Sequence, residues 1–345
     1  MRPREQLEGE KLPDGWTVGK MITKKGGTGA NFSVGYIVHH DDGRQCYLKA
    51  MDYHEQMNVH SSPAELEFTA KMYGFEKCIC EACRDFHMSH VIHAITSGSI
   101  IPHPSAPYGK VEYIIFELAA GDVRGHLDTH DLFDTAFMLR VVHNTGVALQ
   151  QLHEAKIAHQ DVKPSNIMII PNNGGAKVGD LGRAWTQMFA GPHEDFDIPG
   201  DTGYAPVELL YNAISTDPKC RRFAADLYHF GNLIAFVFAR AHINSMLQNH
   251  LAREHRPGRW GGSYSEVLPY VKAAFGAVLA ELKPLLPLEF AEELLAMIAQ
   301  LCEPDPMLRG HPMNRIGHQD QYSLQRYISK LDVLAKKAEF QQARK

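Results

Sequence analysis

The sequence predicts an α+β fold in which strands come first and helices follow. Three observations lead to this prediction. Residues 16–50 alternate strand patterns with turns, residues 131–155 repeat apolar side chains at helical spacing, and residues 226–241 are apolar enough for a buried helix. At 345 residues the chain can bury a substantial core, in one large domain or in two lobes.

The composition is that of an ordinary globular protein, with 44% hydrophobic and 22% charged residues. The formal net charge of −5 gives no reason to expect a nucleic-acid partner, since phosphate-rich partners call for a basic face. No apolar run approaches the roughly 20 residues needed to span a bilayer, and no apolar segment follows the charged N-terminus. We therefore expect a soluble, cytoplasmic protein with no nucleic-acid or membrane partner.

Residues 16–50 contain the strand pattern of the first half. Residues 34–38 alternate as a half-buried strand does, and Asp41-Asp42-Gly43 is a hairpin signal. The strand after this turn carries a lone lysine, Lys49. Before both strands, the glycine-rich turn 26–33 has backbone N–H groups that could approach phosphates closely, although such a turn alone is more often an ordinary loop.

A helix is predicted over residues 63–83, because Pro63 suits a first turn and apolar residues then recur at helical spacing. The other predicted elements are strands at 91–95, 111–116, 167–170 and 176–178, loops and short helices over 243–287, and a terminal helix over 322–342. The strand at 111–116 is apolar enough to be central in a sheet.

Three cysteines, Cys78, Cys80 and Cys83, lie close together before His87. They leave a metal site open as a hypothesis. However, a second, well-separated pair of ligands is missing, and Cys80, Cys83 and His87 also fit one helix face, where free cysteine behaves as a small buried hydrophobe. We favour buried helix packing. The six cysteines do not suggest a disulfide framework in a chain this long.

The most informative stretch is His159-Gln160-Asp161-Val162-Lys163-Pro164-Ser165-Asn166, followed fourteen residues after Asn166 by Asp180-Leu181-Gly182. It offers one carboxylate for a substrate hydroxyl, one cation for a transferring phosphoryl group, and an amide plus a second carboxylate for magnesium. The turn-rich residues 171–175 indicate a hairpin between the two halves, which brings Asn166 and Asp180 together.

This pattern, H-x-D-x-K-x-x-N followed by D-x-G, resembles the catalytic core of the eukaryotic-type (Hanks-type) serine/threonine protein kinases. The resemblance covers roughly residues 16–310. It implies a bilobal protein-kinase-like fold, with residues 1–118 as a small β-rich N-lobe and residues 119–345 as a larger, mainly helical C-lobe, together one catalytic domain. It also implies phosphoryl transfer that depends on ATP and Mg²⁺, with serine or threonine hydroxyls of protein substrates as acceptors.

The resemblance gives the catalytic stretch its roles. Asp161 orients the substrate hydroxyl, Lys163 neutralises charge on the moving phosphoryl group, and Asn166 and Asp180 hold Mg²⁺. A lysine two residues after the aspartate is the pattern of serine/threonine kinases, whereas tyrosine kinases usually differ there.

The resemblance also implies an ATP site. Lys49 holds the α- and β-phosphates and pairs with a glutamate on the following helix; we favour Glu76, with Glu81 as the alternative, because apolar residues follow Glu76 one turn later. The other implied nucleotide contacts are Gly27, Gly29 and Ser33 in the glycine loop, the backbones of Glu117 and Ala119 at the adenine, Phe116 behind it, and Asp122 near the ribose.

The sequence differs from the usual kinase pattern at two positions, and it matches the pattern in one further pair of residues. Gln160 stands where many kinases have an arginine that binds a phosphate on the activation loop, so we expect activity that is not controlled by activation-loop phosphorylation. The glycine loop has Ser33 at its third glycine position. Further on, residues 200–208 resemble the A-P-E segment and residues 305–309 the D-P-x-x-R element, which makes Glu208 and Arg309 predicted partners in structure.

Two other functions remain open. A small-molecule kinase with the same core usually lacks the lysine after the catalytic aspartate and the pair predicted for Glu208 and Arg309. A nucleotide-binding pseudokinase scaffold has no need of Lys49, Asp161, Asn166 and Asp180 together. The sequence does not identify the substrate, the regulator or the oligomeric state.

Overall fold

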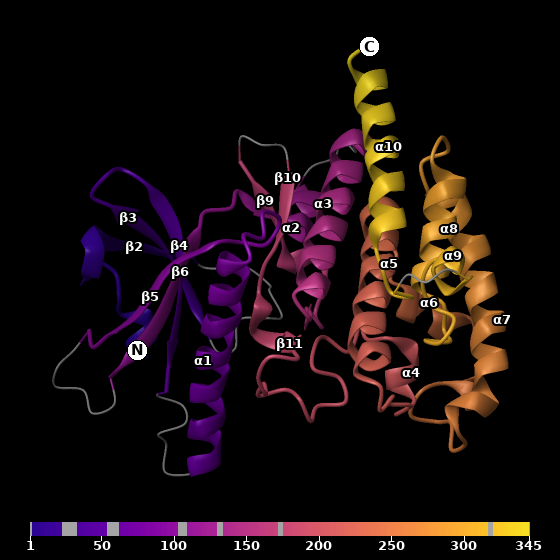
Figure 1. Ribbon diagram of the computed structural model, residues 1–345, viewed down its shortest axis with the longest axis horizontal. Coiled ribbons are helices and arrows are strands. Elements are labelled where there is room, and N and C mark those ends of the chain that lie inside the picture. The colour runs from indigo at the N-terminus through magenta and orange to yellow at the C-terminus, as the bar shows by residue number, and fades with distance from the viewer. Residues whose placement is uncertain are drawn as a thin grey trace. The chain divides into compact units, whose positions relative to one another are not determined.

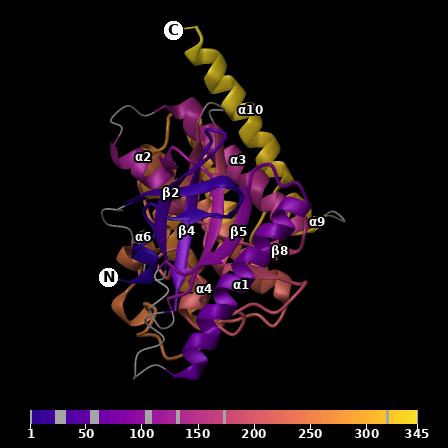
Figure 2. The same cartoon turned by 90° about the vertical axis from the view of Figure 1, so that its left-hand side faces the viewer.

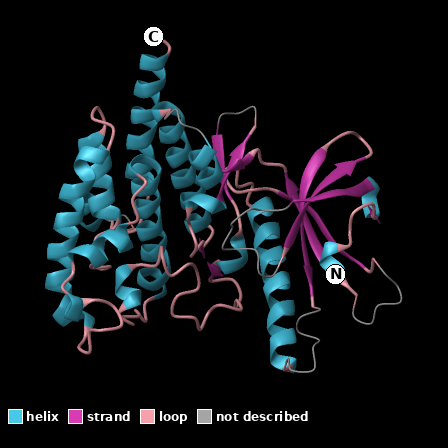
Figure 3. Ribbon diagram, turned by 180° about the vertical axis from the view of Figure 1, so that it is seen from behind, coloured by secondary structure: helices cyan, strands magenta, loops and turns pink. Residues whose placement is uncertain are grey.

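The computed structural model describes residues 2–22, 33–53, 62–102, 109–129, 134–171, 175–316 and 320–344. The chain divides into two compact units, one formed by Met1–Met88 with Ile92–Ala119 and the other by Ser89–Val91 with Ala120–Lys345. The predicted lobes were 1–118 and 119–345. They differ from the two units in that residues 89–91 belong to the second unit and Ala119 to the first. Most strands belong to the first unit and most helices to the second (Figure 3), so the predicted α+β fold class is confirmed.

The first unit is built on a six-stranded antiparallel sheet in the order β1-β2-β3-β4-β6-β5. Its strands are β1 (Lys11–Leu12), β2 (Trp16–Ile22), β3 (Val34–His40), β4 (Gln45–Asp52), β5 (Ala94–Ile100) and β6 (Val111–Glu117), drawn in Figure 1. The predicted hairpin turn joins β3 to β4. Gly43 has a φ of +90°, which favours glycine, and its N–H donates to His40 O.

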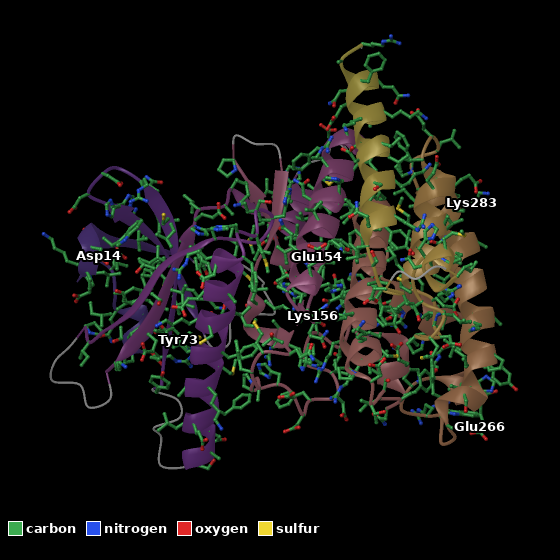
Figure 4. All side chains as sticks on the ribbon, viewed as in Figure 1. Asp14, Tyr73, Glu154, Lys156, Glu266 and Lys283 are labelled. Carbon is green, nitrogen blue, oxygen red and sulfur yellow. The ribbon has the colours of Figure 1, made fainter. Side chains whose placement is uncertain are left out.

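Helix α1 (Pro63–Asp85) lies beside β5 (Figure 2). Ser62 begins it with a capping box, in which Glu65 N–H donates to the serine hydroxyl and the Glu65 carboxylate accepts the Ser62 N–H. Tyr73, labelled in Figure 4, reaches from α1 to the sheet and donates to Gly98 O at 3.3 Å or Tyr113 O at 3.2 Å. The helix is thereby fixed to the strands it covers.

Two predictions for the first unit were wrong. The strand predicted at 91–95 begins instead at Ala94, because Val91 pairs with Val178 of the second unit's sheet. β5 is a polar edge strand, and its serines, threonine and glycine hid it from a search for apolar alternation. In addition, His87 does not continue the cysteine face of α1, since the helix ends at Asp85 and His87 is exposed with a φ of +54°.

Cys80 and Cys83 are each 4% exposed and pack in the core, whereas Cys78 is exposed. Burial raises the pKa of the Cys83 thiol to about 12, so this sulfur stays protonated and apolar at neutral pH. The packing role that the sequence favoured for Cys80 and Cys83 is confirmed.

The second unit is mainly helical. Its helices are α2 (Val123–Thr129), α3 (Thr135–Glu154), α4 (Val207–Leu210), α5 (Ala224–Ala239), α6 (Ile243–His250), α7 (Tyr264–Leu282), α8 (Ala291–Leu301), α9 (Pro312–Ile316) and α10 (Gln325–Gln342). Its short strands form a three-stranded sheet, β10-β9-β7, and a pair, β11-β8, from β7 (Gly121–Asp122), β8 (Ile157–Ala158), β9 (Ile167–Ile170), β10 (Gly175–Val178) and β11 (Trp185–Thr186).

Helix α5 is buried on nearly every side, as the apolar run predicted. Helices α3 and α10 run side by side (Figure 1), and Arg140 of α3 donates to Asp332 and Glu339 of α10. Both begin later than predicted: α3 starts after Asp134, whose side chain caps it by accepting the Phe137 N–H.

The segment 243–287 was predicted as loops and short helices, and this was wrong for its second half. Helix α7 has 19 residues and begins with a capping box of Ser263 and Glu266, the latter labelled in Figure 4. Pro269 obscured the pattern, because proline within a helix usually signals its end. Among the described residues, none of these helices has the length and apolar character that crossing a membrane requires.

Candidate active site

An ion pair joins strand β4 to helix α1 in the first unit. Lys49 Nζ lies 2.7 Å from Glu76 Oε1 and 3.0 Å from Glu76 Oε2. The Glu76 side chain is 5% exposed and the Lys49 side chain 17%, so water and salt screen this pair less than a surface pair. Of the two glutamates that the sequence left open, Glu76 meets Lys49. Glu81 instead lies 4.0 Å from Lys77, one helical turn away.

Strand β6 and the residues after it carry the predicted adenine contacts. Phe116 is buried, with its ring centroid 6.5 Å from that of Tyr47. The Glu117 N–H donates to His93 O at 3.0 Å, and the Glu117 carboxylate accepts the His93 N–H at 2.7 Å. A ligand that bonds the Glu117 backbone would therefore use its carbonyl. Ala119 follows, half-buried.

Of the four remaining residues predicted to contact the nucleotide, the structure describes two, Asp122 and Ser33. Asp122 belongs to the second unit, where its Oδ1 accepts the Gly125 N–H at 2.9 Å and caps α2. Ser33 is half-buried immediately before β3. Gly27 and Gly29 lie outside the described residues. The nucleotide roles of all four stay predictions.

Asp226, near the start of α5, holds the backbone of the catalytic stretch. Its Oδ2 accepts the His159 N–H at 2.7 Å and its Oδ1 accepts the Gln160 N–H at 2.8 Å. Burial by itself raises the pKa of this carboxyl, but hydrogen bonding to His153 and His229 outweighs it and holds the pKa well below its usual range. Asp226 therefore fixes two successive backbone N–H groups of the catalytic stretch.

The His159 ring ties the catalytic stretch to the residue before Asp180. Its Nδ1 accepts the Asp161 N–H at 3.2 Å, which assigns the ring proton to Nε2, and Nε2 donates to Gly179 O at 2.9 Å. The side chain is fully buried. His159 thus sets the spacing between the loop that bears Asp161 and the strand end that leads to Asp180.

Three side chains of the predicted site are in direct contact in the second unit: the catalytic Asp161 and Lys163, and the predicted metal ligand Asn166. Lys163 Nζ lies 3.0 Å from Asp161 Oδ2. Asn166 Nδ2 donates to Asp161 O at 2.8 Å and to Asp161 Oδ2 at 3.1 Å. Because the amide nitrogen is used on Asp161, Oδ1 is the Asn166 atom suited to a cation.

Asp180 is brought to the same place by the hairpin of β9 and β10. Val178 pairs with Ile167 at the end of the hairpin, and the Gly179 N–H donates to Asn166 O at 2.8 Å. The Asp180 side chain is exposed, on a left-handed backbone with φ 57° and ψ 70° that aspartate tolerates better than most residues. The predicted strands therefore bring the backbone of Asn166 against Gly179, the residue before Asp180.

The donor chemistry of Asn166 and Asp180 fits magnesium bound with a nucleotide. Mg²⁺ prefers oxygen ligands, keeps several waters and usually takes only one or two carboxylates from the protein, with substrate phosphates completing its shell. In the ranges that the structure describes, His, Cys, Asp and Glu side chains do not gather in threes around a possible metal position. A two-ligand site that relies on phosphate oxygens is consistent with that arrangement.

Asp201 is a carboxylate of this site that the sequence reasoning missed. Its N–H donates to Asp161 Oδ1 at 2.8 Å, and its Oδ2 lies 3.4 Å from Lys163 Nζ. Gly200 before it has no room for a side chain, because a Cβ there would clash with Gln160 O. The sequence Gly200-Asp201 could have indicated this carboxylate, because a glycine often marks a place where two backbone segments approach closely and a charged residue follows it here.

The predicted partners Glu208 and Arg309 form a buried, two-pronged ion pair. Arg309 Nη1 donates to Glu208 Oε1 at 2.8 Å and Nη2 donates to Oε2 at 2.7 Å. Nη1 also donates to Ala224 O, and Nε donates to Glu303 O. Burial alone lowers the pKa of Arg309, but the facing carboxylate raises it above its ordinary value. The prediction of this pair is confirmed.

Unfolding should depend on pH through His193, which is 2% exposed and lies 3.1 Å from Arg183 Nη1. Burial and the Arg183 charge lower the pKa of His193 from 6.5 to about 4. Between these values the unfolded chain binds more protons than the folded protein. The free energy of unfolding is therefore expected to fall as the pH drops through this window, by about 3 kcal/mol in total.

Urea titrations of the wild type and His193→Gln at pH 7 and pH 4.5 check this expectation. The wild type should lose more stability between the two values than the variant does, because other titrating groups contribute equally to both. An identical loss in the two proteins would contradict the assignment to His193.

Comparison with known proteins adds a family-level match. Residues 21–319 match the family model described as "Protein kinase domain". The chain is 27% identical to beta-adrenergic receptor kinase 1 of Homo sapiens over 133 residues, which is 39% of this chain and 18% of that protein. It is 38% identical to serine/threonine-protein kinase greatwall of Danio rerio over 73 residues, 21% of this chain and 8% of that protein.

A third relative, Aurora kinase of Debaryomyces hansenii, is 30% identical over 122 residues, covering 34% of this chain and 29% of that protein. The chain thus spans under a fifth of the length of the receptor kinase and under a third of the Aurora kinase. The family match covers most of the chain, whereas the individual relatives align only in part.

Proposed function

The chain belongs to the protein kinase family, and from this premise we propose that it transfers the γ-phosphoryl group of ATP, with Mg²⁺, to serine or threonine hydroxyls of protein substrates. The observation that supports this most is the contact of Asp161 with Lys163 and Asn166, in a loop bonded to the residue before Asp180. These are the groups that phosphoryl transfer uses for orientation and charge neutralisation.

Each residue has a separate task in the proposed reaction. Asp161 accepts the hydrogen bond of the incoming hydroxyl and takes its proton late, as the bond to phosphorus forms. Lys163, held by Asp161 and Asp201, places a positive charge at the phosphoryl group. Asn166 and Asp180 hold Mg²⁺, which when bound supplies neutralisation of phosphate charge.

In the first unit, Lys49 is proposed to hold the α- and β-phosphates of ATP. Glu76 fixes the position of the ammonium group, since the pair is short and largely buried. Phe116, Glu117 and Ala119 are proposed to meet the adenine, and Asp122 the ribose.

Serine or threonine is proposed as the acceptor because Lys163 stands two residues after Asp161. The small-molecule kinase is less favoured, since Glu208 and Arg309 form the pair that such enzymes usually lack. The pseudokinase is less favoured because Lys49, Asp161, Asn166 and Asp180 are all present. The cytoplasm is the proposed location, since it keeps thiols reduced and all six cysteines are free.

The proposed enzyme does not need phosphorylation of its activation segment, defined here as residues 180–208. Gln160 is neutral and cannot form an ion pair with a phosphate. Thr186 in this segment is only 3% exposed, and its hydroxyl accepts the Met188 N–H at 3.2 Å. A kinase acting on Thr186 would first have to expose it.

The test is incubation with ATP labelled on the γ-phosphate, Mg²⁺ and generic protein substrates, beside an Asp180→Asn variant. Label should enter protein with the wild type and should vanish with the variant, because an amide binds Mg²⁺ more weakly than a carboxylate. Label found only on added sugars or aminoglycosides would support the small-molecule kinase. Nucleotide binding without turnover under every condition would support the scaffold.

A further inference from the structure

Gln160 is engaged on both sides of its amide by one residue. Its Nε2 donates to Arg222 O at 2.8 Å, and its Oε1 accepts from Arg222 Nη1 at 3.2 Å. Both residues are 3% exposed. Gln160 adopts a φ of +67°, which costs free energy in a residue other than glycine. The glutamine is therefore part of a specific buried contact that compensates a strained backbone.

Arg222 also reaches the activation segment. Its Nη2 donates to Glu194 O at 2.7 Å, and neighbouring Arg221 donates through Nη2 to Glu194 O at 3.3 Å and to Phe196 O at 3.1 Å. Arg221 and Arg222 lie on a π-helical turn, Lys219–Phe223, directly before α5. Single π-helical turns are rare and often occur at functional sites.

The Arg222 guanidinium remains a cation in this buried position. Burial and the like charge of Arg221 lower its pKa to about 10, so it is still protonated at neutral pH. The carboxylates of Glu194, Asp195 and Asp226 act on it favourably through space. Its hydrogen bonds go to two carbonyl oxygens, one on the Gln160 amide and one on the Glu194 backbone.

Arg222 contacts Gln160 and Glu194, and the chain leads from each of these residues to the catalytic site. Gln160 directly precedes Asp161, and the backbone held at Glu194 and Phe196 continues to Gly200 and Asp201. There the Asp201 N–H donates to Asp161 Oδ1 at 2.8 Å. Arg222 thus connects the catalytic stretch to the activation segment at a second point, seven residues before the contact between Asp201 and Asp161.

We propose that Arg222 is a positioning residue that holds the activation segment against the catalytic stretch without a phosphate, by donating to Gln160 and to Glu194 at once. The inference rests on the proposed kinase function and adds the residue that replaces phosphate-dependent control. It explains why a neutral side chain stands at position 160. The positive charge comes from the turn that precedes α5, and the acceptors belong to the catalytic stretch and the segment.

One expected result distinguishes this inference from the alternative that Gln160 merely removes a phosphate-binding arginine. Gln160→Arg, which restores the residue common in other kinases, should impair the enzyme. It would place a second guanidinium within hydrogen-bonding distance of Arg222 in a buried position, and the substitution adds no carboxylate to pair with it. The activity of Gln160→Arg should therefore fall and should not be recovered by phosphorylating the segment.

The experiment compares the steady-state kinetics of phosphatase-treated wild type, Arg222→Met, Arg222→Lys and Gln160→Arg on one protein substrate. For Arg222→Met we expect kcat/KM for the protein substrate to fall about 10–100-fold, the size of a lost charge-assisted hydrogen bond, with KM for ATP little changed. Arg222→Lys should recover part of the loss, since a lysine can reach one carbonyl but not both. Phosphatase treatment should leave the wild type unchanged.

Lys219→Met is the matched control. Lys219 belongs to the same π-helical turn but pairs at the surface with Asp320 at 2.9 Å, so its loss should leave the kinetics unaltered. If Arg222→Met does not fold, Arg222→Lys and hydrogen exchange decide the matter. Amides of residues 193–201 should exchange faster in Arg222→Lys than in the wild type or in Lys219→Met.

The failures are distinguishable. An active wild type whose Arg222 variants keep kcat/KM and segment protection, and lose only thermal stability, would overturn the inference and leave the kinase proposal standing. A wild type that loses its activity on phosphatase treatment would also overturn it. A wild type that labels no protein under any condition would refute the proposed function itself.

Discussion

Replacing Arg309 with methionine is expected to lower the free energy of unfolding by about 3–5 kcal/mol. Arg309 is fully buried, and its guanidinium donates to the Glu208 carboxylate and to the carbonyls of Ala224 and Glu303. Removing the cation leaves the 4% exposed Glu208 without its opposite charge. Urea denaturation of the wild type and Arg309→Met measures the difference.

Two further variants show whether the stability lost in Arg309→Met comes from the unpaired Glu208 charge. Glu208→Leu combined with Arg309→Met should be less destabilised than Arg309→Met alone, because no buried charge of this pair is left unpaired. The recovery should be incomplete, since the two carbonyls also lose a donor. Lys219→Met, which breaks the exposed pair with Asp320, should change stability by less than about 1 kcal/mol. An Arg309→Met protein as stable as this control would contradict the account of the pair.

Replacing Asp161 with asparagine is expected to lower kcat about 10²–10⁴-fold with the fold intact. The new amide would retain an oxygen for the Asp201 N–H. It would lose the charge that faces Lys163 at 3.0 Å and the carboxylate that is proposed to accept the hydroxyl proton. Because both losses act on the reacting groups, kcat should fall far more than KM for ATP rises.

Asp128→Asn, a change of the same kind at an exposed position on α2, is the control and should leave kcat unaltered. Thermal unfolding of both variants should match the wild type closely enough to exclude misfolding. An Asp161→Asn protein with kcat within a factor of about two would remove Asp161 from the mechanism.

The parts of the structure that could be predicted are those where the local sequence pattern is compatible with only one local structure. Helix α5 is mostly apolar, and nearly all of its residues are buried. The turn around Gly43 needs a positive φ, and the hairpin of β9 and β10 follows from turn residues between two apolar runs. The catalytic stretch could be interpreted because the family resemblance implies a distinct chemical task for Asp161, for Lys163 and for Asn166.

The parts that could not be predicted depend on contacts distant in the sequence. Strand β5 carries polar residues at the edge of its sheet, and residues 89–91 follow the second unit because of a pairing with Val178. Asp201 and Arg222 lie 40 and 61 residues after Asp161, and the sequence around Asp161 gives no local sign of either. Their roles become visible only when the folded backbone brings carbonyls and carboxylates to them.

The most direct test of the central claim uses three peptides that differ only in one acceptor residue, serine, threonine or tyrosine. Each is incubated with labelled ATP, Mg²⁺ and either the wild type or Asp161→Asn, and the initial rate of label transfer is measured. The account predicts transfer to serine or threonine by the wild type, little to tyrosine, and a rate at least about 10²-fold lower with the variant. Equal rates for the two proteins, or transfer to tyrosine alone, would contradict it.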